Sequence, residues 1–208
     1  MRATTTALGI VALLLPVVSA FQVTGNEIEG ALYKVYTDAS GNEVHELVTN
    51  EIFKADTDSV IAAGIAQSSA VSARDVRGIL NARADRRLYC GCGILLDRSD
   101  CDASVNDLRG QLRSKGTAYV PIGQAYYAVK NSVVSFVCSR KGNSAVTGVS
   151  ENTFNGLLEQ ISHYCGPYIA GTYKHGTPIN SAAVDVGYMR SGGDFCARAE
   201  SSPNQNCW

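Results

Sequence analysis

The chain has 208 residues, and its 18 Lys and Arg side chains almost balance its 19 Asp and Glu side chains, for a formal net charge of −1. A nearly neutral chain lacks the concentrated positive charge with which proteins bind nucleic acids or anionic membranes, so we expect neither partner. With 3 histidines, the chain has few groups for acid–base catalysis near neutral pH.

The first 20 residues have the pattern of a secretory signal peptide. Arg2 is followed by an apolar run over residues 7–18, and small residues stand at positions 18–20. The run is too short for a membrane anchor, and no later stretch is long and apolar enough to span a bilayer. We therefore expect cleavage after Ala20 and a secreted, extracellular protein without a stable membrane anchor. The alternative is that the apolar run forms a buried core helix.

Residues 21–87 differ from the rest of the chain because they contain no cysteine. Residues 32–36 and 44–48 are typical of two strands, with turn-forming residues 38–42 between them. Residues 55–84 have little to bury, and the segment ends in Arg86-Arg87, a pair that suits a kexin-type protease. Two solvated surface arginines are the alternative. The sequence thus predicts a pro-segment at 21–87 and a mature domain at 88–208.

All the cysteines lie in this second half, which in an oxidising compartment predicts a disulfide framework. They are Cys90, Cys92, Cys101, Cys138, Cys165, Cys196 and Cys207. Seven is odd, so at most three bridges form, and the remaining thiol either joins two chains or lies buried. The spacing of Cys90 and Cys92 is not the Cys-x₂-Cys of common zinc sites, so we expect no metal and no cofactor.

The mature domain begins with a predicted strand at 88–96 and a helix that ends near Gly116, whose apolar positions include Cys101 and Leu108. Residues 126–129 and 132–138 are typical of a hairpin. A second helix is predicted from an N-cap at Ser150 to Gly166, and the last strand covers 183–189.

The element order β-α-β-β-α-β predicts an α+β fold, a split βαβ sandwich with two helices on one face of an antiparallel sheet. Cys101 and Cys165 lie on the apolar stripes of the two helices, and Cys138 ends a strand. We expect these three cysteines to bridge helices to the sheet, in pairings that the sequence does not specify.

Residues 168–178 are predicted to be a loop, and loops are where binding residues concentrate. The candidate contact residues in it are Tyr168, Tyr173, Lys174 and His175. Tyrosines that are half-buried with a solvated hydroxyl are the alternative.

Five segments together resemble a group of small secreted proteins of filamentous fungi, which includes effectors of plant pathogens and is similar in fold to the smut-fungus killer toxins. They are residues 89–93 (YCGCG), 100–102 (DCD), 132–138 (SVVSFVC), 161–166 (ISHYCG) and 185–189 (DVGYM). The resemblance covers about residues 88 to 196. It implies a secreted protein, matured by a kexin-type protease, that acts on a host or competitor protein, in some cases together with a second effector. It carries over no catalytic residue.

The first functional hypothesis is therefore a secreted fungal effector or killer-toxin-like protein that acts by surface recognition and not as an enzyme. The alternative is a small secreted hydrolase, most simply a ribonuclease, for which Glu159, His163, His175 and Arg140 are the candidate residues. A third hypothesis is a structural or self-protective surface protein.

Overall fold

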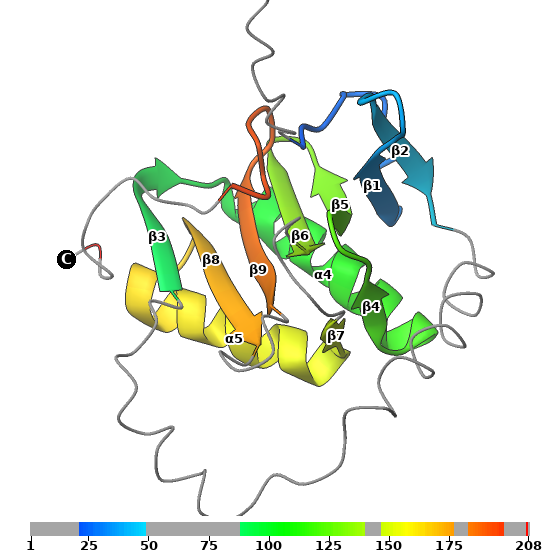
Figure 1. Ribbon diagram of the computed structural model, residues 1–208. Coiled ribbons are helices and arrows are strands. Elements are labelled where there is room, and N and C mark those ends of the chain that lie inside the picture. Colours follow the sequence, from blue (N-terminus) through cyan, green and yellow to red (C-terminus); the bar gives the residue numbers. More distant parts are fainter. Residues whose placement is uncertain (1–20, 49–87, 140–146, 177–182, 198–206, 208) are drawn as a thin grey trace, which may run out of the picture.

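The computed structural model (Figure 1) describes residues 21–48, 88–139, 147–176, 183–197 and 207. The predicted signal peptide with Ala20, the dibasic pair Arg86-Arg87, and Arg140 lie outside the described residues. Among the described residues, no helix is long and apolar enough to cross a membrane.

The structure is α+β, with two helices packed on an antiparallel sheet of seven strands, in the order β2-β1-β5-β6-β9-β8-β3. A separate two-stranded ladder joins β4 and β7. The elements in chain order are β1 (Tyr33–Thr37), β2 (Glu43–Leu47), β3 (Leu88–Leu95), α4 (Arg98–Lys115), β4 (Ala118–Val120), β5 (Gln124–Lys130), β6 (Val133–Ser139), β7 (Thr147–Val149), α5 (Glu151–Cys165), β8 (Ile169–Gly176) and β9 (Ala183–Arg190).

Local capping signals set the bounds of both helices, and the sequence predicted the N-cap at Ser150 and the helix ends at Gly116 and Gly166. The Asp97 carboxylate accepts a hydrogen bond from the backbone N–H of Asp100, and the Ser150 hydroxyl accepts one from the N–H of Thr153. Each side chain thereby satisfies a donor that the first helical turn leaves unpaired. Gly116 and Gly166 follow the last residues of α4 and α5.

The sheet has an apolar core on each face. On one face the helices cover alternate residues of the central strands, including Tyr126, Val137 and Val186. The opposite face carries Tyr127 and Phe136, and it is covered by residues from both ends of the chain, which include Phe21 and Phe195. Alternation along each strand sends neighbouring side chains to opposite faces, so a nearly continuous apolar run such as β6 supplies both cores.

Helix α5 lies very close to the sheet because Gly171 on β8 has no side chain. A Cβ atom at this position would stand 2.2 Å from Cγ2 of Ile161, which is fully buried. The glycine therefore lets the helix sit directly on the strand, as glycine does where two backbones approach closely.

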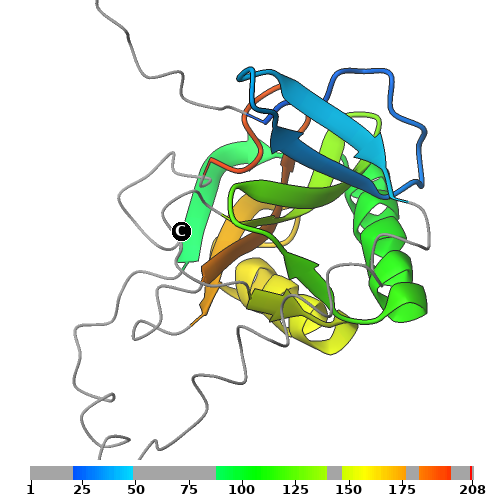
Figure 2. The same ribbon diagram turned by 45° about the vertical axis from the view of Figure 1, so that its right-hand side comes forward.

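The hairpin predicted at 32–48 is present, but its position in the sheet was not predicted. Strand β1 pairs with β5 as well as with β2, so the hairpin extends the sheet of the cysteine-rich region (Figure 2). Segments on either side of the predicted processing site thus form one sheet.

Most of the segment predicted as a contact loop, residues 168–178, is a strand, and residues 177 and 178 lie outside the described part of the chain. Residues Ile169–Gly176 form β8, which pairs with β3 on one side and β9 on the other. Gly171, Lys174 and Gly176 gave this segment the composition of a loop, but two neighbouring strands satisfy its backbone groups.

Candidate functional site

Three disulfide bonds hold the cysteine-rich region together, with Cα–Cα distances typical of such bridges. Cys90–Cys165 joins β3 to the end of α5, with 5.4 Å between the Cα atoms. Cys138–Cys196 joins the end of β6 to the C-terminal loop at 5.8 Å, and Cys92–Cys207 joins β3 to the last described residue at 5.2 Å.

The predicted role of the cysteines was correct for Cys165 and wrong for two others. Cys138 binds a loop cysteine instead of a helix, and Cys101 is a free, buried thiol. Of the two fates considered for the odd cysteine, the structure therefore shows the buried thiol.

A pocket with a volume of about 200 Å³ opens between the two helices, above β9. Its wall is mostly apolar, and Cys101 and Tyr188 at its base are almost fully buried. The lining residues are Cys101, Asp102, Val105, Leu158, Ser162, Pro167, Tyr168 and Tyr188. A concave, largely apolar site with a few polar groups is the usual form of a small binding site.

The polar groups of this pocket are fixed by one another. The hydroxyls of Ser162 and Tyr188 lie 3.1 Å apart, and burial raises the pKa of Tyr188 to about 12, so its hydroxyl stays protonated. Burial and the neighbouring Asp102 carboxylate raise the pKa of Cys101 to about 12. Because the thiolate is the nucleophile, Cys101 has no activated sulfur.

Tyr168 stands at the rim in an unusual backbone conformation, with φ +61°. Non-glycine residues adopt this left-handed region rarely, and such strain concentrates at functional sites. Its hydroxyl donates to the Asp102 carboxylate at 3.3 Å, and the Arg98 guanidinium lies 5.4 Å from the centre of its ring. The backbone carbonyl of Tyr168 also accepts from the N–H of Leu96. Two contacts thus hold the side chain of Tyr168, and the third holds its backbone.

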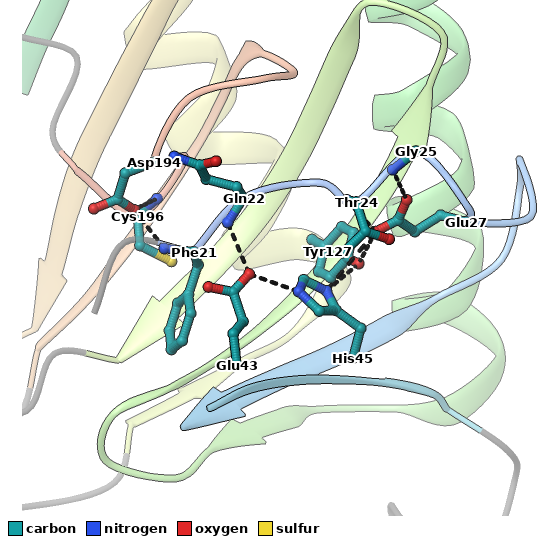
Figure 3. Close-up of polar contacts among 10 residues, drawn as sticks. All are labelled: Phe21, Gln22, Thr24, Gly25, Glu27, Glu43, His45, Tyr127, Asp194 and Cys196. Carbon is teal, nitrogen blue, oxygen red and sulfur yellow. Dashed lines mark hydrogen bonds and ion pairs between the residues drawn. The ribbon is translucent and has the colours of Figure 1, made fainter. Parts of the chain in front are cut away.

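A second polar cluster lies on the opposite face of the sheet, where the N-terminal segment crosses β5 (Figure 3). The fully buried Tyr127 donates its hydroxyl proton to Oε1 of Glu27 at 2.9 Å, and the same hydroxyl lies 2.7 Å from Nδ1 of His45. Nε2 of His45 lies 2.6 Å from Oε1 of Glu43. Four side chains from three segments thus form one chain of hydrogen bonds.

The Tyr127 hydroxyl is the centre of this cluster. It has a single proton, which goes to Glu27, so its oxygen must accept from Nδ1 of His45. The other ring nitrogen of His45 contacts Glu43, so the imidazole connects the Tyr127 hydroxyl to the Glu43 carboxylate.

The ionisation of Glu27 and Tyr127 follows from their surroundings. Burial raises the pKa of Glu27, but donors that include the backbone N–H of Thr24 and the Tyr127 hydroxyl outweigh this effect and hold the pKa below its ordinary value. Burial, and next the hydrogen bond to Glu27, raise the pKa of Tyr127. At neutral pH, Glu27 is a carboxylate and Tyr127 a neutral phenol.

The start of the N-terminal segment is bound to the C-terminal loop. The backbone N–H of Phe21 donates to Oδ1 of Asp194 at 3.1 Å, and the Phe21 ring packs near Phe195, with 6.5 Å between ring centres. The next N–H, of Gln22, donates to Glu43 at 2.9 Å. Side-chain carboxylates thus hold the first two backbone amides of this segment.

The predicted site residues are not gathered at one place. Tyr168 lines the pocket, whereas Tyr173, Lys174 and His175 lie half-buried along β8. Of the residues proposed for a hydrolase, Glu159 and His163 are exposed on α5. Helix α5 and β8 run in opposite directions (Figure 1), so the helix end that carries His163 and the strand end that carries His175 lie at opposite ends of this pair of elements.

Sequence reasoning missed both the pocket and the polar cluster. His45 lies 82 residues and Glu27 100 residues before Tyr127 in the sequence, and no local motif relates them. Among the described residues, no group of three or more His, Cys, Asp or Glu side chains is arranged to hold a metal ion.

No model of a known protein family matches the sequence, and neither characterised proteins nor solved structures give a match. The resemblance to fungal effectors and killer toxins therefore stays a prediction from the quoted residues.

Proposed function

We propose that the protein is an extracellular effector or killer-toxin-like protein of a fungus, which acts by binding a host or competitor protein and not by catalysis. The observation that carries the proposal is the pocket between α4 and α5, with the strained Tyr168 at its rim. A rigid aromatic ring beside an apolar hollow is the kind of feature that anchors a partner's side chain. The three disulfides support action in an oxidising, extracellular compartment.

The state of the acid–base groups supports binding over catalysis. The cluster that would be best suited to proton transfer is closed: the side chain of Glu27 is 2% exposed and that of His45 11%. Their polar atoms are already engaged with each other and with Tyr127. A substrate would have to displace contacts that hold the fold together.

The test applies the purified secreted protein to plant tissue and to cultures of competing fungi, with Tyr168→Ala beside it. Tyr119→Ala, on β4 and 38% exposed, is the matched control. We expect Tyr168→Ala to need at least about tenfold more protein for the same response, the loss of one good anchor, while Tyr119→Ala acts like the natural protein. Circular dichroism confirms that each variant is folded.

Two results would contradict the proposal. An undiminished response from Tyr168→Ala would remove the pocket as the binding site. RNA cleavage that is lost in His163→Ala or His175→Ala would favour the hydrolase instead.

A further inference from the structure

The N-terminal segment, residues 21–48, has its apolar side chains buried in the cores on both faces of the sheet. Leu32 and Val48 belong to the core beneath the helices, at 2% and 5% exposure. Phe21, Tyr33 and Val35 belong to the opposite core, and Val35 is fully buried. A hairpin that supplies residues to both cores is an integral part of the sheet and not a cover laid over it.

The backbone of the hairpin completes the edge of β5. Strand β1 pairs with β5 from Tyr33 opposite Tyr127 to Tyr36 opposite Gln124. Without β1, this side of β5 would present unpaired backbone groups, and an exposed strand edge favours aggregation.

Polar contacts fasten the segment along its whole length. Phe21 binds Asp194 at the start, and Glu27 binds Tyr127 further along. At the end, Nζ of Lys115 on α4 donates to the backbone carbonyl of Val48 at 2.8 Å. Between these points, Glu29 pairs with Lys130 of β5.

None of these attachments is covalent, because residues 21–87 contain no cysteine. The predicted cut after Arg87 would therefore leave two chains with no covalent bond between them. We infer that residues 21–48 stay bound after such a cut, so that the extracellular protein is a complex of two chains and not the domain 88–208 alone. The pro-segment then carries a permanent part of the sheet.

The inference is tested with secreted protein that carries a recognition sequence for a site-specific protease between Ser68 and Ser69, a position within residues 49–87. The cut is made in the purified, folded protein, and the products are compared by size-exclusion chromatography and native mass spectrometry, then by mass spectrometry in denaturant. We expect one species containing both fragments in a 1:1 ratio under native conditions, and two separate masses in denaturant. Elution of the larger fragment without the smaller one, in any state of association, overturns the inference.

Two variants of the hairpin make the test specific to the contacts described. Val35→Asp places a carboxylate in the core, and Leu47→Asp places one on β2, where the side chain is 45% exposed. We expect the smaller fragment to be lost from cut Val35→Asp and retained by cut Leu47→Asp; retention by both overturns the assigned contacts.

A second measurement covers the case in which Val35→Asp does not fold. The cut natural-sequence protein is titrated with urea, and release of the smaller fragment is compared with global unfolding by circular dichroism. Coincident midpoints are expected for a hairpin that is part of the sheet, whereas release well before unfolding overturns the inference.

Discussion

Replacement of Tyr127 by Phe tests whether the polar cluster stabilises the fold. The Phe side chain fills the same buried space, so the change removes the hydroxyl and leaves the packing intact. The hydroxyl donates to Glu27 at 2.9 Å and lies 2.7 Å from Nδ1 of His45, so both partners lose a contact inside the protein. A hydrogen bond to a charged group contributes about 1.5–3 kcal/mol, so we expect a loss of about 2 kcal/mol in the free energy of unfolding.

For a chain of this length, about 2 kcal/mol lowers the midpoint of thermal unfolding by about 4–8 °C. The assay is thermal and urea unfolding at pH 7, followed by circular dichroism. Tyr119→Phe is the control: its side chain is 38% exposed, and its effect should stay within about 0.5 kcal/mol. A double-mutant cycle with Glu27→Gln should give a coupling of about 0.5–3 kcal/mol. If Tyr127→Phe is as stable as the control, the cluster does not hold the N-terminal segment and the reasoning is refuted.

Three further predictions follow from single groups. The pKa of Glu27 is lower in the folded protein than its ordinary value, so the stabilisation from its ionised carboxylate is present above that ordinary value and is lost as pH falls through the folded pKa. In urea unfolding, the difference in stability between the natural protein and Glu27→Gln should therefore shrink in acid, and a difference independent of pH would contradict this. Gly171→Ala should lower the free energy of unfolding by about 1–3 kcal/mol, because its Cβ would lie 2.2 Å from the Ile161 side chain. Gly110→Ala, in the interior of α4 with open space around it, should raise the free energy of unfolding by about 0.5–1 kcal/mol, and thermal unfolding of both variants checks the opposite signs. Cys101 should resist iodoacetamide at pH 8 in the folded protein and react once per chain in urea, as measured by intact mass, since burial raises its pKa to about 12; rapid labelling of the folded protein would contradict its burial.

The helices could be predicted from the sequence because their signals are local. For α5, the N-cap Ser150, an apolar stripe that includes Phe154 and Ile161, and the terminating Gly166 all lie within 17 consecutive residues. The β5–β6 hairpin is local in the same way. Strand β8 could not be predicted, because its identity depends on β3 and β9, which lie on either side of it and pair with it through the backbone.

The disulfide pattern and the pocket could not be predicted from the sequence, because both depend on how distant elements are placed in space. Cys101 and Cys165 both lie on the apolar stripe of a helix, so their sequence contexts are equivalent. What separates them is what each one faces: Cys165 meets Cys90 of β3, whereas Cys101 meets the space between the helices. The pocket itself combines residues of α4, α5 and β9, whose positions depend on how closely the helices approach the sheet.

The absence of cysteine from residues 21–87 predicted that this segment is separate from the folded domain. The structure shows why a lack of cysteine does not place a segment outside the folded unit. A disulfide is one way to fix a segment, and a shared sheet with a buried face is another. The N-terminal segment, residues 21–48, is fixed in the second way: its strand β1 lies beside β5, its Val35 is buried, and its Glu27 binds Tyr127. Its contacts with the C-terminal loop span 173 residues, so no window of the sequence contains both partners. A boundary in composition therefore marks a change in how the chain is stabilised, and the boundary of the folded unit has to be found from the strand pairing.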